Sequence, residues 1–306
     1  MQSPSAAAVR LGDEVAAAIA DGRPVLALES TILTHGLPRP RNLEVGLESE
    51  ELVRQAGVVP ATIGVIDGVA TVGLGTAEIE RLCTTDAVVK VSVRDLPIAR
   101  AKCLDGGTTV AATAWLAHRA GIRVMSTGGL GGVHRGASET FDESADLTTL
   151  ATTPITLVSA GVKSILDIGA TLERLETLNI PVVGYRTNRY PGFYVADSGF
   201  ALDYRIESPA DAAALARARD ELGSAAAVLV ANPVDEAKQL DPAFHDSVLA
   251  EALAAASDAG ISGHETTPFL LDQVQRATGG RSLEVNLEVY RGNVALGAEI
   301  ARAVAG

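Results

Sequence analysis

The chain has 306 residues, of which 47% are hydrophobic and only 4% aromatic, and it carries a formal net charge of -13. The length allows one large α/β domain or two small ones, and the composition suits helices packed closely on a sheet of small aliphatic side chains. The negative charge disfavours nucleic acid as a partner, because polyanion recognition normally needs a basic face, but a small phosphorylated ligand can still bind in one locally positive pocket.

The N-terminus lacks the basic-then-apolar layout of a secretion signal, and no apolar run approaches transmembrane length. We therefore expect a cytoplasmic protein with no membrane partner, in which residues 1–7 form a flexible tail. The two cysteines, Cys83 and Cys103, have no CxxC or metal-site spacing, so both are expected to be buried, reduced thiols.

Short β-branched runs alternate with alanine-rich helical runs, which is typical of an α/β layered architecture. Strands are expected at 24–30, 61–66, 69–74, 87–92, 122–127, 155–160, 180–185, 201–206 and 226–232. Helices are expected at 8–21, 42–56, 76–83, 108–120, 164–178, 208–222, 242–259, 267–278 and 282–304. The Asp67-Gly68 pair is a hairpin signal, so one antiparallel pair should interrupt a mostly parallel sheet. No linker or repeat occurs, and the irregular stretches 128–145 and 186–200 are interpreted as active-site loops.

Polar residues follow the first of these strands directly. The apolar run 24–28 leads into Glu29, Ser30 and Thr31, with His35 just beyond. Because ligands bind beside the carboxyl ends of strands in open α/β sheets, Glu29 could act as a general acid. The alternative is that Glu29 is a helix cap or a salt-bridge partner.

A lysine, Lys90, lies within the apolar strand 87–92, between valines. Burying an unpaired ammonium there would cost several kcal/mol, so Lys90 should bind an anion, pair with a carboxylate or have a lowered pKa. The alternative is a structural pair with Asp95, with Arg94 beside it.

A glycine-rich loop follows the strand 122–127 and ends in basic residues: Gly128, Gly129, Gly131, Gly132, His134 and Arg135. Such a loop lets the backbone approach a ligand, and its amides could cradle a phosphate, with His134 or Arg135 adding charge. The loop is neither a GxxxxGK[ST] nor a GxGxxG motif.

Acidic residues close the same loop. Asp142, Glu143 and Asp146 offer oxygen ligands for a hard divalent cation such as Mg²⁺ or Mn²⁺, held largely through water. The alternative is a set of solvated loop acids.

A second lysine, Lys163, follows the strand 155–160 through Gly161, just before the expected helix 164–178. The positive end of the helix dipole and partial burial both disfavour an ammonium, which favours a neutral, nucleophilic amine. An ordinary surface lysine is the alternative.

Eight segments together resemble the pseudouridine-5'-phosphate glycosidase family, also described as indigoidine synthase A-like: ESTILTHGLPRPRN, VVKVSVRDLP, GGTTVAAT, TGGLGGVHRG, FDESADL, SAGVKSILD, TPFLL and SLEVN. The resemblance extends from about residue 24 to residue 304. It implies a single domain over 1–306 with a three-layer α/β/α sandwich and a mixed, mostly parallel central sheet. It also implies one Mn²⁺, or another divalent cation such as Mg²⁺, per subunit, and a homotrimer.

The resemblance implies reversible cleavage of pseudouridine 5'-phosphate to uracil and D-ribose 5-phosphate, in nucleotide catabolism. Glu29 matches the proton donor, Lys163 the Schiff-base nucleophile and Asp142 the metal carboxylate. Substrate contacts fall on Lys90, Val110, Ser144, Ala145, Asp146 and Asn286, with His134 and Arg135 as further candidates from the glycine-rich loop. Asn286 is a reasonable uracil contact, since its amide both donates and accepts.

Three other functions remain open from the residues alone. A Schiff-base aldolase acting on a phosphosugar would use the same lysines and loop, and a regulatory module could bind a phosphosugar without chemistry. A ribokinase-type phosphotransferase would need a nucleotide site, and no recognisable one occurs in the sequence.

Overall fold

The computed structural model describes residues 9–261 and 266–306, so the tail expected at 1–7 lies outside the described residues. Its strands are β1 (Val9–Leu11), β2 (Val25–Glu29), β3 (Val59–Ile66), β4 (Val69–Val72), β5 (Val89–Val91), β6 (Gly106–Thr108), β7 (Val124–Ser126), β8 (Thr156–Ser159), β9 (Val182–Tyr185), β10 (Arg205–Ile206) and β11 (Val228–Ala231). Its α-helices are α1 (Asp13–Ala20), α2 (Arg41–Gln55), α3 (Thr76–Thr84), α4 (Leu96–Lys102), α5 (Val110–Arg119), α6 (Ala137–Thr140), α7 (Ala145–Leu150), α8 (Ile168–Thr177), α9 (Pro209–Glu221), α10 (Pro242–Asp258), α11 (Thr266–Ala277) and α12 (Arg281–Ala305), with a π-turn at Ile32–Gly36 and a 3-10 turn at Val93–Asp95.

The strands form one mixed sheet in the order β1-β4-β3-β2-β7-β8-β11-β9-β10, with β6 beside β3 and β5 beside β6. Within the described chain, all strand pairs are parallel except β3 with β4 and β3 with β6. The hairpin predicted at Asp67-Gly68 is confirmed, because these two residues have φ of 49° and 76° and join β3 to antiparallel β4.

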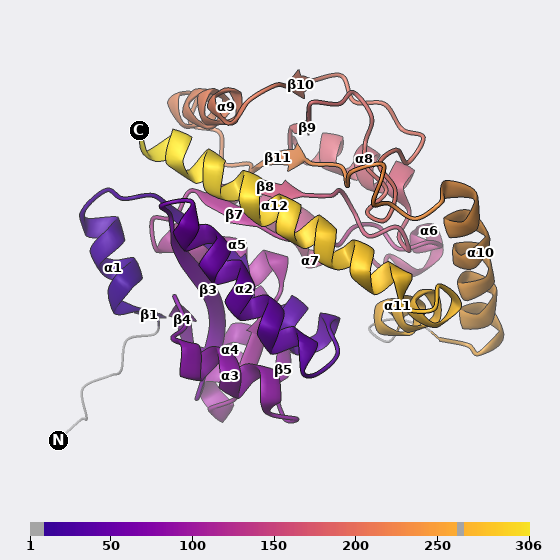
Figure 1. The fold of residues 1–306 in the computed structure, drawn as a ribbon, viewed down its shortest axis with the longest axis horizontal. Coiled ribbons are helices and arrows are strands. Elements are labelled where there is room, and N and C mark those ends of the chain that lie inside the picture. The colour runs from indigo at the N-terminus through magenta and orange to yellow at the C-terminus, as the bar shows by residue number, and fades with distance from the viewer. Residues whose placement is uncertain (1–8, 262–265) are drawn as a thin grey trace.

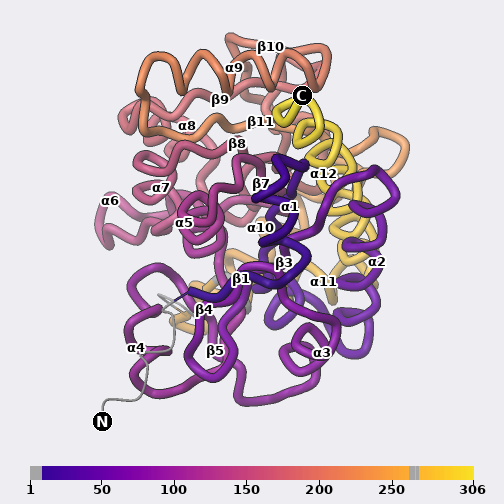
Figure 2. Tube along the Cα trace, turned by 90° about the vertical axis from the view of Figure 1, so that its left-hand side faces the viewer, coloured from indigo at the N-terminus to yellow at the C-terminus, as the bar shows by residue number. Residues whose placement is uncertain are grey.

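Helices cover both faces of this sheet (Figures 1 and 2), which confirms the expected three-layer α/β/α sandwich. Helices α2 and α12 pack on one face, where Leu26 and Leu28 point. Helices α1, α5, α7 and α8 pack on the other face, where Val25 and Ala27 point. Because side chains alternate along a strand, Glu29 shares the face of Val25 and Ala27, on the side of α5 and α7.

The sheet divides where β2 ends. Strand β2 pairs with the first half of β3, and beyond it β6 takes the place of β2 beside Gly64 and Val65. Lys90 of β5 lies opposite Gly107 of β6. The carboxyl end of β2 therefore meets the β5–β6 pair, which explains how Glu29 and Lys90 come to lie in one region.

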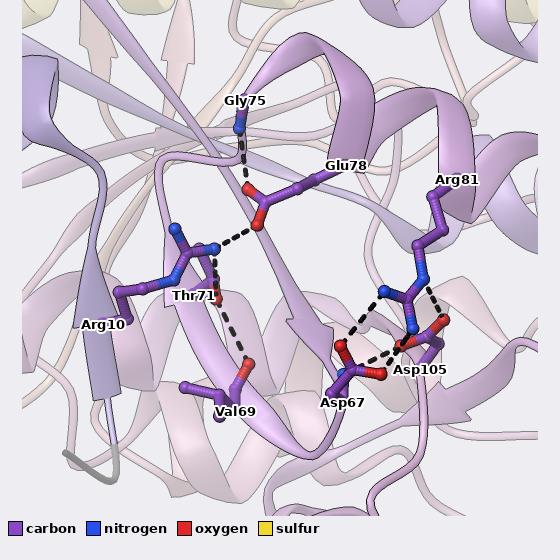
Figure 3. Close-up of polar contacts among 8 residues, drawn as sticks. All are labelled: Arg10, Asp67, Val69, Thr71, Gly75, Glu78, Arg81 and Asp105. Carbon is purple, nitrogen blue, oxygen red and sulfur yellow. Dashed lines mark hydrogen bonds and ion pairs between the residues drawn. The ribbon is translucent and has the colours of Figure 1, made fainter. Parts of the chain in front are cut away.

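An arginine clasp holds the β5–β6 pair in this place (Figure 3). The Arg81 guanidinium binds the carboxylates of Asp67, in the hairpin turn, and Asp105, which directly precedes β6. The Asp67 amide also donates to Asp105 Oδ1 at 2.8 Å. In the first turn of α3, Glu78 accepts the Gly75 amide and pairs with Arg10 of β1. Contacts from both ends of α3 therefore hold β1 and the start of β6 against the β3–β4 hairpin.

Short elements account for most differences from the expected pattern. The expected helix 8–21 is wrong at its start, where β1 pairs with the neighbouring strand β4. Strand β6 was not expected, and the helix expected at 108–120 begins at Val110, after β6. The expected strand 201–206 shrinks to β10. Three-residue strands are fixed by partners distant in sequence, and local periodicity carries no signal of them.

Helix boundaries also differ near the expected loops. Helix α8 begins at Ile168, not at 164, because Asp167 caps it by accepting the Ala170 amide at 2.9 Å. Helices α4, α6 and α7 occupy segments for which no helix was expected. Cys83 is buried as expected, whereas the expectation for Cys103 is wrong, since it is exposed in the left-handed turn after α4.

None of the helices in residues 9–261 and 266–306 has the length and apolarity that crossing a membrane requires. That the whole chain forms a single domain stays a prediction.

Helix α12 is seated on the sheet at Ser126, whose hydroxyl donates to the Asn293 carbonyl at 2.8 Å. We predict that Gly297→Ala destabilises the fold by about 1–3 kcal/mol, because its Cβ would lie 2.0 Å from Ser126 Oγ and 3.1 Å from Leu26 Cδ1. The matched control is Gly292→Ala in the same helix, where the nearest contact would be 3.8 Å away. It should raise the free energy of unfolding by up to about 1 kcal/mol through helix propensity. Urea unfolding measures both, and equal effects would contradict this packing.

Candidate active site

The carboxyl group of Glu29 lies at the centre of the polar residues that the fold collects. Glu29 ends the fully buried strand β2 and is 7% exposed. Thr127 follows the neighbouring strand β7, and its hydroxyl donates to Glu29 Oε1. The parallel pairing of β2 with β7 thus delivers both side chains to the same edge of the sheet.

Burial raises the pKa of Glu29 above its ordinary value of 4.5, because desolvation penalises the carboxylate. The positive charge of Lys163 and the hydrogen bond from Thr127 oppose this effect, as does the more weakly acting Lys90, while the charge of Asp146 adds to it. The raised pKa widens the pH range over which Glu29 is protonated and can donate a proton. These interactions also show that four segments, expected separately from the sequence, meet in one place.

Lys90 is the exposed member of this group, so the expectation that its strand buries it is wrong. Partial loss of hydration and the charge of Lys163 lower its pKa, while Asp146 and Glu29 oppose that shift. Asp95 pairs instead with Arg94 and accepts the Ser92 amide at 2.9 Å. Within the described chain Lys90 has no salt bridge, which leaves its ammonium available to an anion.

Asp146 joins three segments of the site. It is 6% exposed, and its Oδ1 accepts the Ala111 amide at 2.9 Å while its Oδ2 accepts the Gly131 amide at 2.8 Å. Ser144 caps α7 by accepting the Asp146 amide at 3.2 Å. The adjacent Val110 is 3% exposed, so its amide at the start of α5 is the group that could face a ligand. The Asp146 carboxylate is thus a structural clamp as well as a charge next to Glu29.

Lys163 is half-buried and lies beside the glycine-rich loop. Its amide donates to the Leu130 carbonyl at 3.1 Å, and Leu130 pairs with Val162 as an isolated bridge. Since α8 begins only at Ile168, after the Asp167 cap, the expected position of Lys163 directly at a helix N-terminus is wrong. The position of the Lys163 side chain is therefore set by the irregular backbone between β8 and α8.

The glycines of the loop leave space into which neighbouring side chains pack. A Cβ on Gly129 would lie 2.6 Å from the Phe193 ring, and one on Gly131 would lie 2.2 Å from Ser144 Oγ. The amides of Leu130, Gly131, Val133 and His134 donate to groups of the protein itself. The expected phosphate cradle is therefore not formed by these four amides.

Asn286 of α12 faces the loop with an unused acceptor. Its buried Oδ1 has no hydrogen-bond partner among the described residues, and a Cβ on Gly128 would lie 3.5 Å from it. Seven residues further along α12, Asn293 donates to the carbonyls of Thr127 and Gly128 at 2.8 and 3.1 Å. A buried polar atom without a partner is costly, which suits a ligand contact at Asn286.

Two residues of this region are absent from the sequence prediction. Thr127 ends the expected strand 122–127, and a polar residue at that position is a usable signal. Asn293 lies two helical turns from Asn286 on the apolar side of α12, and its polarity within an apolar stripe is the signal that could reveal it.

The other end of the loop holds His134 and Asp142, whose Nδ1 and Oδ2 are 3.8 Å apart, and the His134 amide donates to the Asp142 carbonyl at 3.0 Å. Glu143 is occupied by Arg174 at 2.9 Å, and Asp146 by two amides. Arg135 is exposed, and no contact within the described chain ties it to Glu29. Of the three acids expected to bind metal, Asp142 thus has the loosest contact, the one of 3.8 Å to His134.

The described residues contain no cluster of three side chains that could hold a metal ion. A single carboxylate nevertheless fits a hard divalent cation that keeps most of its water, as Mg²⁺ commonly does. Asp142 and the residues around it therefore suit a loosely held, water-rich ion and do not suit a closed structural site.

Comparison with known proteins covers nearly the whole chain. The family model of indigoidine synthase A like protein matches residues 14–303. A pseudouridine-5'-phosphate glycosidase of Saccharopolyspora erythraea is 65% identical over 296 residues, covering 97% of this chain and 98% of the relative. The solved prealnumycin C-glycosynthase AlnA in complex with ribulose 5-phosphate is 38% identical, with a TM-score of 0.90 over 97% of each chain. An indigoidine synthase A-like protein of Thermotoga maritima is 35% identical, with a TM-score of 0.89 over both full chains.

The raised pKa of Glu29 predicts a pH-dependent stability. In the parent protein, ionising the buried Glu29 costs nothing below pH 4.5, and the cost accumulates as the pH rises from 4.5 through the raised pKa of the folded state. Glu29→Gln has no such cost, so its stability relative to the parent should rise through that window and then level off. Urea unfolding of both proteins from pH 4 to pH 8 measures the difference, and a difference that is constant with pH would contradict the assignment.

Proposed function

The chain belongs to the indigoidine synthase A-like protein family, and on this basis we propose that it reversibly cleaves pseudouridine 5'-phosphate to uracil and D-ribose 5-phosphate. It would thus be a pseudouridine-5'-phosphate glycosidase. The observation that carries the proposal is the Glu29 carboxyl group, which is buried at the end of β2, accepts the Thr127 hydroxyl and is acted on by the charges of two lysines.

A carbon–carbon glycosidic bond has no heteroatom leaving group at C1', so protonation of a leaving group cannot break it. Covalent catalysis provides another route. It requires an acid that opens the ribose ring, an amine that bonds to C1' and groups that hold phosphate and uracil. The site contains candidates for each of these roles.

Glu29 donates its proton to the ring oxygen of ribose as the C1'–O4' bond breaks, and the amine of Lys163 bonds to C1' and passes a proton back to the Glu29 carboxylate. Glu29 then protonates uracil C5. The lone pair of the lysine nitrogen forms the iminium as the C1'–C5 bond breaks, and the bonding electrons leave with uracil. Water hydrolyses the imine, which releases ribose 5-phosphate and regenerates the amine. The reverse sequence joins uracil to ribose 5-phosphate.

We assign the substrate contacts by what each group offers to a ligand. The ammonium of Lys90 is available to an anion, and the start of α5 at Val110 faces the Asp146 clamp. Ser144, Ala145 and Asp146 form the start of α7 beside the glycine-rich loop. Asn286, with its unused acceptor, is assigned to the uracil edge, and His134 and Arg135, at the far end of the glycine-rich loop, are further substrate contacts.

The proposal includes a divalent cation, Mn²⁺ or Mg²⁺, at Asp142. When bound, such an ion supplies positive charge that a substrate phosphate can use. The proposal also includes a homotrimer, on the basis of the family resemblance, and the cytoplasmic location expected from the sequence.

Turnover separates this proposal from its alternatives. Lys163→Ala should lower kcat for uracil release by about 1,000-fold or more while pseudouridine 5'-phosphate still binds, because the amine acts in chemistry and not in substrate recognition. The matched control is Lys102→Ala, an exposed lysine of α4, which should keep normal turnover. Cleavage between sugar carbons without uracil release would support an aldolase, and binding without any turnover in the parent would support a regulatory module.

The role of Asp142 is tested through metal dependence. Asp142→Asn should raise the Mn²⁺ concentration needed for half-maximal uracil release after EDTA treatment, by about 10- to 100-fold. Glu143→Gln is the control, since Glu143 is already occupied by Arg174. Full activity of the parent in excess EDTA would reject the metal.

A further inference from the structure

The backbone that carries Lys163 lies between two other segments. We call residues 160–163 the lysine segment. On one side the glycine-rich loop holds it: the Ala160 amide donates to the Gly128 carbonyl at 3.0 Å, and the Leu130 amide donates to the Gly161 carbonyl at 2.9 Å. These bonds, with the one from the Lys163 amide to Leu130, fix the edge of the lysine segment that faces β7.

On the other side lies the segment 190–193, which belongs to the irregular stretch 186–200. The Val162 amide donates to the hydroxyl of Tyr190 at 3.0 Å, and the Phe193 amide donates to the Ala160 carbonyl at 3.2 Å. A Cβ on Gly161 would lie 2.6 Å from the Pro191 carbonyl oxygen, so the contact is close. The lysine segment is thus held on both sides.

Tyr190 is itself rigidly placed. It is 1% exposed, and its own amide donates to the Phe200 carbonyl at 2.9 Å. Its carbonyl accepts both the amide and the hydroxyl of Ser198, at 2.9 and 2.6 Å. Burial raises the pKa of the phenol, so the hydroxyl stays neutral. A neutral hydroxyl on a fixed ring gives the Val162 amide a partner with one defined position.

Val162 is the residue directly before Lys163, and it is fully buried. Without Tyr190 the Val162 amide would lack its hydrogen bond in a region closed to water, and the peptide would move to find another. Such a movement would be carried to the Cα of Lys163, and a displacement of about 1 Å at a nucleophile can cost about 100-fold in rate.

We propose that Tyr190 is a positioning residue for Lys163, in that its hydroxyl fixes the Val162 peptide and thereby aims the amine at C1' of the substrate. The inference rests on the proposed function, because it assigns Tyr190 to the formation of the Schiff base. Tyr190 does not touch the substrate in this scheme and acts through the backbone.

The test compares Tyr190→Phe with Tyr194→Phe. Both tyrosines are buried, and Tyr194 packs edge-on against Phe193 at 4.7 Å, but no hydrogen bond of its hydroxyl occurs within the described chain. Each variant loses one oxygen atom and keeps its ring. In Tyr190→Phe, the rate at which cyanoborohydride traps ribose 5-phosphate on Lys163 should fall by about 10- to 100-fold. Tyr194→Phe should trap at the parent rate.

Two further measurements separate positioning from general damage. Hydrogen exchange of the Val162 amide should accelerate in Tyr190→Phe and not in Tyr194→Phe. The dissociation constant of pseudouridine 5'-phosphate should be the same in Lys163→Ala with and without Tyr190→Phe, since no amine remains to be aimed.

The outcomes are distinct. Trapping at the parent rate in Tyr190→Phe would overturn the positioning role. So would an equal fall of the trapping rate in Tyr194→Phe, or a higher dissociation constant of pseudouridine 5'-phosphate in the double variant than in Lys163→Ala. If the parent itself traps no ribose 5-phosphate, the Schiff-base step of the proposed function fails, and the positioning role fails with it. Faster hydrogen exchange of the Val162 amide in Tyr190→Phe would in that case show that the Val162–Tyr190 hydrogen bond serves the structure and not the chemistry.

Discussion

The carboxyl group of Glu29 ends a strand in which every residue is buried, and its nearest polar partner is the hydroxyl of Thr127. Desolvation therefore favours the protonated form, while two lysine charges limit how far it does so. Lys90 in turn lies close enough to Lys163, Asp146 and Glu29 for their charges to act on its pKa. The charges of Lys90, Lys163 and Asp146 all act on Glu29. Exposing Glu29 to water would therefore lower its pKa and weaken it as a proton donor.

The fold provides this arrangement by ending β2 where the β5–β6 pair begins. The hairpin turn at Asp67 and the Arg81 clasp fix that junction from outside (Figure 3). From the opposite layer α12 reaches the same edge, where Asn293 holds the end of β7 and Asn286 presents its amide. The site is thus built from both helical layers as well as from the sheet, which is why its residues are spread from Glu29 to Asn286.

Much of this could be predicted from the sequence. Glu29 and Lys163 stand at strand ends, where polar residues after apolar runs are a strong signal, and the Asp67-Gly68 hairpin follows from local turn chemistry. Strand β6 could not be predicted, because three residues pair only through partners far away in sequence. The packing of Phe193 and Ser144 against the loop glycines could not be predicted, because a glycine shows that a side chain is missing and not which group fills the space. The contact of Tyr190 with the Val162 amide likewise depends on tertiary packing alone.

The central claim is that the amine of Lys163 bonds to the sugar while Glu29 supplies the proton. A crystal structure of the protein after cyanoborohydride reduction with ribose 5-phosphate tests it most directly. The account predicts continuous electron density from Nζ of Lys163 to C1 of an open-chain pentose, with the Glu29 carboxyl within hydrogen-bonding distance of the sugar. Density that joins the sugar to Lys90, or an unmodified Lys163 whose Nζ points into solvent away from a bound pentose, would contradict it.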